Sequence, residues 1–204
     1  MGNKIGVYAG SFNPFTLGHL NIMQQAENFF GVGNVVIAVG CNPAKPESRA
    51  SLSQRAYKVE KQLPDKSVVS YDCFVHEMID ALKKKNPEND YWLVRGIRNG
   101  EDVNQEAIQL KFLRDMMTDR LNSVFFVCDR EFDYISSSAI RLIEAERPAE
   151  AIKYLGKTNP DYVVLNDGGI GVRTIKLALE CVDNPAIVFT GKYEQCMDFL
   201  EGKI

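Results

Sequence analysis

Four short polar motifs in this sequence combine residue types that bind phosphate groups. The first is Gly10-Ser-Phe-Asn-Pro-Phe-Thr-Leu-Gly18-His19. Its small residues let backbone amides approach a ligand, and the helix expected after it adds a partial positive charge. His19 can donate a hydrogen bond to a phosphate oxygen, and Thr16 can do the same or cap the helix. A tight turn with a capping histidine is the simpler alternative, but Thr-x-Gly-His together with Ser-Phe-Asn-Pro favours a phosphate site.

The second and third motifs add cations. Cys41-Asn-Pro-Ala-Lys45-Pro places a lysine in a proline-bracketed loop, where it can reach an anion, although a solvated lysine is the common case for such a loop taken alone. Arg95-Gly96-Ile97-Arg98 sets two arginines three residues apart, and guanidinium groups match the geometry of phosphate. Asp102 and Glu106 follow on one helix face. Glu106 suits either a ribose or adenine contact or an ion pair with one of the arginines.

The fourth motif is Tyr134-Ile-Ser136-Ser137-Ser138-Ala-Ile-Arg141. Three hydroxyls and several free amides at a helix start can bind an anion, and a plain serine cap is the alternative. Together the four motifs offer more phosphate-binding groups than one monophosphate needs. A triphosphate with a second anionic substrate would use them all.

The elements that position these motifs alternate between strand and helix. Runs rich in Val, Ile, Tyr and Phe predict strands at 4–9, 34–40, 67–74, 91–94 and 123–128. Amphipathic spacing predicts helices at roughly 18–30, 51–63, 76–86 and 100–121, and a fifth ending near Pro148. This order predicts an α/β fold with an open, doubly wound, five-stranded parallel sheet of Rossmann-like type. Ligands of such sheets bind beyond the carboxyl ends of the strands, where the four motifs lie.

The pattern starts again near residue 156. We therefore expect a main domain at 1–155 and a small βαβα extension at 156–204. Strands are predicted at 161–166 and 186–190, and helices at 171–182 and 193–202. The glycines at 168, 169 and 171 fit an ordinary turn better than a second phosphate loop.

Composition sets limits on function. The chain has 204 residues, of which 45% are hydrophobic and 25% charged, and its net charge of −3 argues against a general nucleic-acid or membrane-surface binder. No apolar run is long enough to span a membrane, and the first residues lack a signal-peptide pattern. Five scattered cysteines and two histidines offer no spacing for a zinc site. These features favour a reduced, cytoplasmic protein, in which Cys41 is structural and His76 lies at the surface or caps a helix.

The four motifs, with Ser51-Leu-Ser-Gln-Arg55, make residues 3–146 resemble the nucleotidyltransferase superfamily and, within it, the bacterial phosphopantetheine adenylyltransferases. Thr-x-Gly-His at Thr16 is typical of that family, whereas nicotinate-nucleotide adenylyltransferases have His-x-Gly-His. The resemblance implies transfer of AMP from ATP to 4′-phosphopantetheine, which gives dephospho-coenzyme A and pyrophosphate. It also implies a homo-hexamer, and Mg²⁺ held mostly by phosphate and water oxygens.

The resemblance also implies roles for individual residues. His19 would stabilise the transition state, Lys45 and Arg95 would hold the acceptor phosphate, and Ser11 would contact substrate. The implied ATP-binding residues are Ser11, Phe12, His19, Gly96, Ile97, Arg98, Glu106, Phe132, Asp133, Tyr134, Ile135, Ser136, Ser137 and Ser138.

The sequence departs from the family pattern in three places. Asn13 stands where the family usually has Asp, the stretch between Lys45 and Arg55 is one residue longer, and residues 156–204 extend past the family's usual end. These departures keep two alternatives open. One is a related nucleotidyltransferase with another phosphate acceptor, such as nicotinamide or nicotinate mononucleotide, and the other is a non-catalytic nucleotide-binding module.

Overall fold

The computed structural model describes residues 2–41, 51–116, 121–158, 162–165, 170–172 and 187–203. The chain forms two compact units. Unit 1 comprises Met1–Gln62 and Lys66–Lys157, and unit 2 comprises Leu63–Asp65 and Thr158–Ile204.

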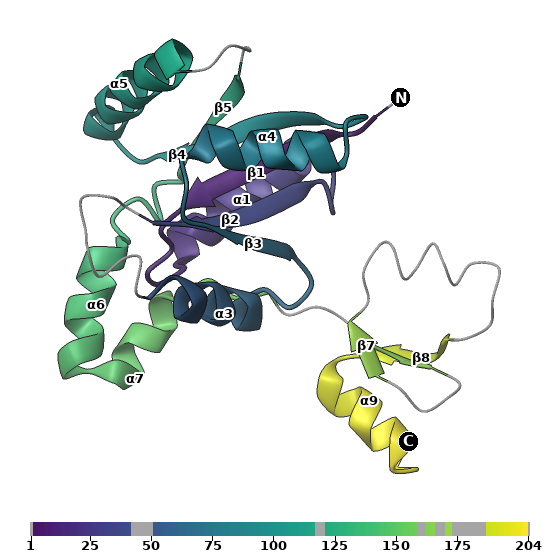
Figure 1. The fold of residues 1–204 in the computed structure, drawn as a ribbon. Helices are drawn as coiled ribbons and strands as arrows, with labels where there is room; N and C mark the ends of the chain where they lie inside the picture. The colour runs from purple at the N-terminus through teal and green to yellow at the C-terminus, as the bar shows by residue number, and fades with distance from the viewer. Residues whose placement is uncertain are drawn as a thin grey trace. The chain divides into compact units, whose positions relative to one another are not determined.

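Unit 1 is built on a parallel sheet of five strands in the order β3-β2-β1-β4-β5 (Figure 1). The strands are β1 (Lys4–Gly10), β2 (Val35–Gly40), β3 (Ser67–Tyr71), β4 (Asp90–Ile97) and β5 (Asn122–Val127). The central strand β1 pairs with β2 on one side and β4 on the other, so that Tyr8 lies between Ile37 and Val94 in register. The strand order reverses at β1, and such a switch point opens a crevice at the carboxyl ends of the strands. The predicted fold class is confirmed.

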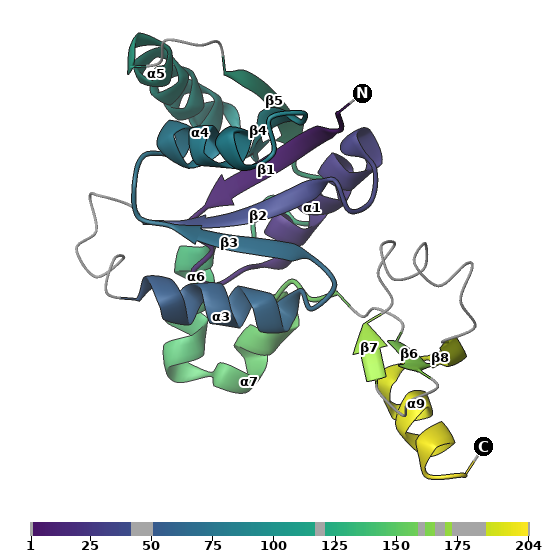
Figure 2. The ribbon, with the colours of Figure 1, turned by 45° about the vertical axis from the view of Figure 1, so that its right-hand side comes forward.

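The helices that connect the strands are α1 (Leu17–Phe30), α3 (Leu52–Gln62), α4 (Val75–Lys85) and α5 (Gly100–Met116). Figures 1 and 2 show α4 against one face of the sheet and α1 against the other. After β5 the chain forms α6 (Ser137–Glu146), α7 (Pro148–Ala151) and the 3-10 turn η1 (Ile152–Tyr154).

Both faces of the central strands are buried, which explains why these strands read as near-continuous apolar runs. On the α4 face the alternate residues Ile5, Val7 and Ala9 of β1 pack with Met78 and Ile79 of α4. On the opposite face Gly6 lies against the ring of Phe30 in α1. A smaller cluster around Ile135, Ile140 and Ala151 fixes α6 beside the first turn of α1.

Helix α5 differs from its predicted pattern. The sequence predicts one apolar face that includes Val103 and Leu113, yet Leu113 is buried while Val103 is 46% exposed. A second stripe, Ile108, Phe112 and Met116, is exposed as well. The physical reason is that α5 lies against β4, the strand next to the edge of the sheet, and joins the core through Leu110 and Leu113, so much of its surface stays uncovered. Residues 117–120 of the predicted helix lie outside the described residues.

Unit 2 contains an antiparallel sheet in the order β7-β6-β8, followed by α9 (Tyr193–Leu200). Its strands are β6 (Tyr162–Leu165), β7 (Ile170–Val172) and β8 (Ile187–Gly191). The predicted helix at 171–182 is wrong at its start, because Ile170–Val172 instead pairs with β6 as a hairpin that satisfies its backbone groups. Residues 173–186 and the turn at 166–169 lie outside the described residues.

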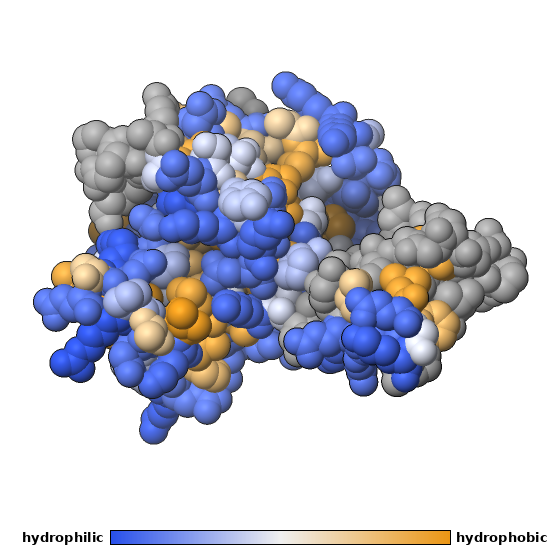
Figure 3. Space-filling view, turned by 90° about the horizontal axis from the view of Figure 1, so that it is seen from below, coloured by the Kyte–Doolittle hydropathy of each residue, from blue (hydrophilic) through white to orange (hydrophobic). Residues whose placement is uncertain are grey.

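The face of unit 1 that carries α3, α6 and α7 is largely hydrophilic, with smaller apolar areas between the hydrophilic ones (Figure 3). Exposed apolar side chains include Tyr57 on α3, Leu142 on α6 and Ile152 of η1, which follows α7. Single exposed apolar residues are ordinary on a protein surface. Among the residues that the structure describes, no helix is both long enough and apolar enough to cross a bilayer.

Candidate active site

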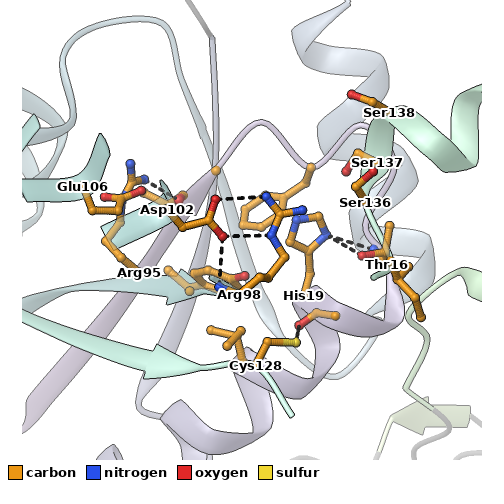
Figure 4. Close-up of a pocket in the computed structure, with 18 of the residues that line it drawn as sticks. Thr16, His19, Arg95, Arg98, Asp102, Glu106, Cys128, Ser136, Ser137 and Ser138 are labelled. Carbon is orange, nitrogen blue, oxygen red and sulfur yellow. Dashed lines mark hydrogen bonds and ion pairs between the residues drawn. The ribbon is translucent and has the colours of Figure 1, made fainter. Parts of the chain in front are cut away.

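A cavity of about 360 Å³ opens at the carboxyl ends of β1 and β4, beside the first turns of α1 and α6 (Figure 4). The strand-end motifs around His19, Arg95–Arg98 and Ser136–Ser138 all reach it, although they are far apart in the sequence. Its polar lining residues are Tyr8, Thr16, His19, Arg95, Arg98, Asp102, Gln105, Glu106, Cys128, Ser136, Ser137 and Ser138.

His19 is held by the residue that starts its own helix. Thr16 is the N-cap of α1, and its backbone N–H donates to Nδ1 of His19 at 3.0 Å. The Thr16 hydroxyl lies 3.1 Å from the same nitrogen. Because Nδ1 accepts a hydrogen bond, the proton of the neutral ring sits on Nε2. His19 therefore reaches the cavity as a neutral donor.

The electrostatic surroundings of His19 also favour the neutral ring. Burial lowers the pKa of His19 from 6.5 to about 4, and the positive charge of Arg98 acts in the same direction. A neutral imidazole can donate to a phosphate oxygen without carrying a charge of its own.

Aromatic side chains fix the ring of His19 from the other sides. Phe12 is 3% exposed and meets His19 edge to face, with ring centroids 5.1 Å apart. Phe12 adopts a positive φ of 42°, which a non-glycine residue holds only when its surroundings require it. A side chain at Gly10 would lie 2.9 Å from the Phe12 ring, so the strand must end in glycine here. The buried Phe12 ring thus positions His19.

Arg98, in the loop after β4, and Asp102, in the first turn of α5, form a hydrogen-bonded ion pair. Both Nε and Nη2 of Arg98 donate to the Asp102 carboxylate, at 3.0 and 3.1 Å, and the backbone N–H of Arg98 donates to it at 2.9 Å. Burial alone would raise the pKa of Asp102, but these hydrogen bonds hold it below its usual value. The hydrogen bond to Asp102 likewise raises the pKa of Arg98. The guanidinium is therefore oriented and permanently charged at the wall of the cavity.

Arg95 makes three hydrogen bonds on three sides. Its Nε donates to Glu106 at 2.6 Å, its Nη2 to the Gln109 side-chain oxygen at 2.6 Å, and its Nη1 to the carbonyl of Ala9 at 3.0 Å. Of the two contacts that the sequence leaves open for Glu106, the structure contains the ion pair. A guanidinium has five N–H bonds, so two remain for a ligand.

The serine motif builds the start of α6. Ser136 is the N-cap, and its hydroxyl accepts from the backbone N–H of Ala139 at 3.2 Å. Ser137 donates to the carbonyl of Pro14 at 3.0 Å, and Arg141 donates to the carbonyl of Asn13. The first turn of α6 is thereby tied to the loop before His19, and its N-terminal amides lie beside the cavity.

A second cavity of about 440 Å³ adjoins the first, and the two share Gly10 and Arg95 in their linings. Its apolar side comes from α4 and α5 and the turn before α4, and its other wall from the ends of β1, β2 and β3. The lining residues are Gly10, Ser11, Gly40, Cys41, Tyr71, Cys73, Phe74, Val75, Arg95, Gln109, Phe112, Leu113 and Met116. The exposure of Phe112 and Met116 on α5 is thus explained, because both side chains line this cavity.

Most of the residues that the sequence predicts for the site lie around the first cavity, but not all of them. Of the residues expected at the nucleotide, Ile97, Phe132, Asp133 and Tyr134 line neither cavity, and Tyr134 is 68% exposed. Ser11 lines the second cavity only. Lys45 lies outside the described residues.

Two polar residues of the site were missed. Arg55 is 3% exposed, and its Nη1 donates to the carbonyls of Ser11 and Gly40, which ties the ends of β1 and β2 together. Gln109 holds Arg95. Arg55 enters the sequence analysis only as the last residue of the Ser51-Leu-Ser-Gln-Arg55 motif, with no role assigned to it. Gln109 is a polar residue on an otherwise amphipathic helix, which does not distinguish it from a surface residue.

The residues that the structure describes contain no group of three His, Cys, Asp or Glu side chains that could hold a metal ion. The two carboxylates in the first cavity are already bonded to arginines, Asp102 to Arg98 and Glu106 to Arg95.

Comparison with known proteins places this site in a family. Residues 7–143 match the family model described as cytidylyltransferase-like, which covers every described residue that lines the two cavities. The chain belongs to the cytidylyltransferase-like family. Within it, the chain is 36% identical over 137 residues to a phosphopantetheine adenylyltransferase from Actinobacillus pleuropneumoniae, covering 67% of this chain and 82% of that protein.

A second relative carries the same name. A phosphopantetheine adenylyltransferase from Petrotoga mobilis is 34% identical over 157 residues, covering 77% of this chain and 92% of the relative. Among solved structures, the NadR protein in complex with NAD and AMP-PNP superposes with a TM-score of 0.51 and 18% identity. That superposition covers 76% of this chain and 45% of NadR, and at this identity it shows the shared fold alone.

Proposed function

We propose that this protein transfers the adenylyl group of ATP to 4′-phosphopantetheine, giving dephospho-coenzyme A and pyrophosphate. The observation that carries the proposal is the position of Arg95 in a wall shared by two cavities. One cavity is polar and suits a triphosphate, and the other has an apolar side and suits an extended acceptor. The curated names of relatives up to 36% identical support the identity of that acceptor.

The chemistry needs no general base, because the nucleophile is already a phosphate anion. The difficulty is to bring two anions together and to stabilise the charge that develops on the α-phosphate and the leaving pyrophosphate. His19 would donate from Nε2 to the α-phosphate, while Arg98 and the amides and hydroxyls of Ser136–Ser138 would bind the triphosphate. Arg95 would hold the acceptor phosphate together with Ser11 and Lys45.

We propose that ATP enters as its Mg²⁺ complex. The carboxylates in the first cavity are bonded to arginines, so phosphate and water oxygens would supply the ligands of the ion. Mg²⁺ would offset the negative charge of the triphosphate, which lowers its repulsion from the incoming acceptor.

Pyrophosphate release tests the proposal. The full chain is incubated with ATP and Mg²⁺, alone and with 4′-phosphopantetheine, nicotinate mononucleotide or nicotinamide mononucleotide, and with CTP in place of ATP. We expect release only with ATP and 4′-phosphopantetheine. Release with a different acceptor or with CTP would replace the assigned substrates, and ATP binding without release from any acceptor would indicate a non-catalytic module.

The family resemblance also leads us to propose a cytoplasmic homo-hexamer. Light scattering after size-exclusion chromatography measures the assembly directly. A mass six times that of the chain is expected, and a monomer would contradict it.

A further inference from the structure

We propose that Gln109 controls how strongly Arg95 binds the acceptor phosphate, because its neutral amide holds the guanidinium without cancelling its charge. This inference rests on the proposed function for the identity of the acceptor. It concerns a residue that the family resemblance does not single out and that the sequence motifs do not contain.

The contact between the two side chains has a definite direction. Arg95 can only donate hydrogen bonds, so the Gln109 atom 2.6 Å from Nη2 is the carbonyl oxygen Oε1. The amide nitrogen of Gln109 is then left over, and it has no hydrogen-bond partner among the described residues. Because Gln109 lines the second cavity, its N–H groups can donate to an oxygen of the acceptor beside Arg95.

Glu106 and Gln109 both accept hydrogen bonds from Arg95, but each lines a different cavity. They lie three residues apart on α5, which places them on neighbouring positions of one helix face. Glu106 lines the first cavity and not the second, whereas Gln109 lines the second and not the first. The carboxylate therefore faces the nucleotide side and the neutral amide faces the acceptor side.

This arrangement has an electrostatic consequence. One carboxylate, 2.6 Å from Nε, already offsets part of the charge of Arg95. A second carboxylate at position 109 would enclose the guanidinium between two negative charges and would repel an incoming phosphate at close range. A neutral amide orients the guanidinium equally well and leaves its remaining charge to the acceptor. Gln109 is thus a positioning residue that also determines the affinity of the acceptor site.

Three variants of the full chain test the inference: Gln109→Glu, Gln109→Leu and the control Asn104→Asp. Gln109 is exposed, so neither of its substitutions disturbs a buried core. Asn104 is an exposed residue of the same helix that lines neither cavity, so Asn104→Asp adds the same charge away from Arg95. The unfolding midpoint of each variant checks that it is folded.

The measurement is KM for 4′-phosphopantetheine and for ATP, at low and at high salt. We expect Gln109→Glu to raise KM for the acceptor about tenfold at low salt, and salt to shrink this effect because it screens the added charge. We expect Gln109→Leu to raise KM about threefold at either salt concentration, since only hydrogen bonds are lost. KM for ATP should stay within about twofold, and Asn104→Asp should behave as the wild type.

Unchanged KM for the acceptor in both Gln109 variants would overturn the inference, as would an equal effect from Asn104→Asp or an equal rise in KM for ATP. Failure of the proposed function would look different, because the wild type itself would not turn over 4′-phosphopantetheine. In that case the dissociation constant of inorganic phosphate is measured with a non-hydrolysable ATP analogue filling the first cavity. Binding must weaken in the order wild type, Gln109→Leu, Gln109→Glu, and any other order overturns the inference.

Discussion

At the scale of single residues, the state of His19 is decided by the backbone that surrounds it. The Thr16 N–H occupies Nδ1, and burial keeps the ring neutral by lowering its pKa to about 4. The same N–H, at the N-cap of α1, would otherwise lack a partner. The His19 side chain therefore both caps α1, through Nδ1, and presents a donor to the ligand, through Nε2. A substitution that tests the second role must keep the hydrogen bond to the Thr16 N–H and remove the Nε2 donor.

His19→Gln is such a substitution. A glutamine at the third position of a helix can accept from the N-cap N–H, so the start of α1 is retained. The imidazole Nε2 donor is lost from the reacting phosphate. We expect kcat to fall about 100- to 1,000-fold with little change in the unfolding midpoint, because one donor to a developing charge has roughly that effect. Steady-state pyrophosphate release measures it, and turnover within tenfold of wild type would remove His19 from its assigned role.

The lowered pKa of His19 also predicts a pH dependence of stability. In the unfolded chain the histidine binds a proton with a pKa of 6.5, but in the folded protein it stays neutral down to about pH 4. The unfolded state therefore gains protons first as the pH falls, and stability is lost between pH 6.5 and 4. The expected loss by pH 4.5 is about 2 to 3 kcal/mol in the free energy of unfolding.

Urea denaturation of the wild type and of His19→Gln at pH 7 and pH 4.5 isolates this effect. Carboxylates titrate in both proteins, so their contribution cancels in the comparison. The wild type should lose more stability than the variant by the stated amount. Equal losses would mean that His19 is protonated in the folded protein.

At the scale of elements, the loop before α1 is supported by a segment that follows α7. Leu155 forms a β-bridge with Thr16, and the Gly156 N–H donates to the carbonyl of Phe15 at 3.1 Å. The Gln62 side chain bonds the carbonyls of Phe15 and Gly156, both at 3.0 Å. The turn that presents His19 is thus held by Leu155 and Gly156, which lie more than a hundred positions later in the chain.

Gly156→Ala tests this support. An added Cβ would lie 2.5 Å from the carbonyl oxygen of Thr16 and 2.9 Å from the Phe15 ring, so the backbone must move. We expect a loss of about 1 to 3 kcal/mol in unfolding free energy and a fall in kcat of about tenfold or more, because His19 moves with Thr16. Gly100→Ala is the control, since a Cβ there meets nothing within 4 Å. An active, stable Gly156→Ala variant would show that the segment does not support the loop.

The elements also show where sequence reasoning succeeds. The five strands, their order along the chain and the polar motifs that follow four of them were predictable, because burial of the central strands on both faces and turn residues leave local patterns. Residues such as Arg55 and Gln109 were not, because their partners are 44 and 14 residues away and depend on how the elements pack. Leu113 belongs to the apolar face that the sequence predicts for α5, and in the structure it lines the second cavity together with Phe112, which lies outside that face.

At the scale of the whole molecule, the division into two units separates the site from the C-terminal region. Every described residue that lines either cavity lies between Tyr8 and Ser138, within unit 1. The family model ends at residue 143, and the Actinobacillus pleuropneumoniae relative matches 67% of this chain. Unit 2 has its own sheet, β7-β6-β8, with α9.

We therefore expect a chain truncated after Thr158 to keep its activity. Thr158 is retained because its hydroxyl donates to the Asp65 carboxylate, which lies in the connection between α3 and β3. Since the reaction depends on groups held by unit 1, kcat and both KM values should stay within about threefold of the full chain. Circular dichroism and pyrophosphate release check folding and activity on the same sample. If the truncated chain folds but loses turnover more than about tenfold, unit 2 contributes to the reaction, and its residues belong in the description of the active site.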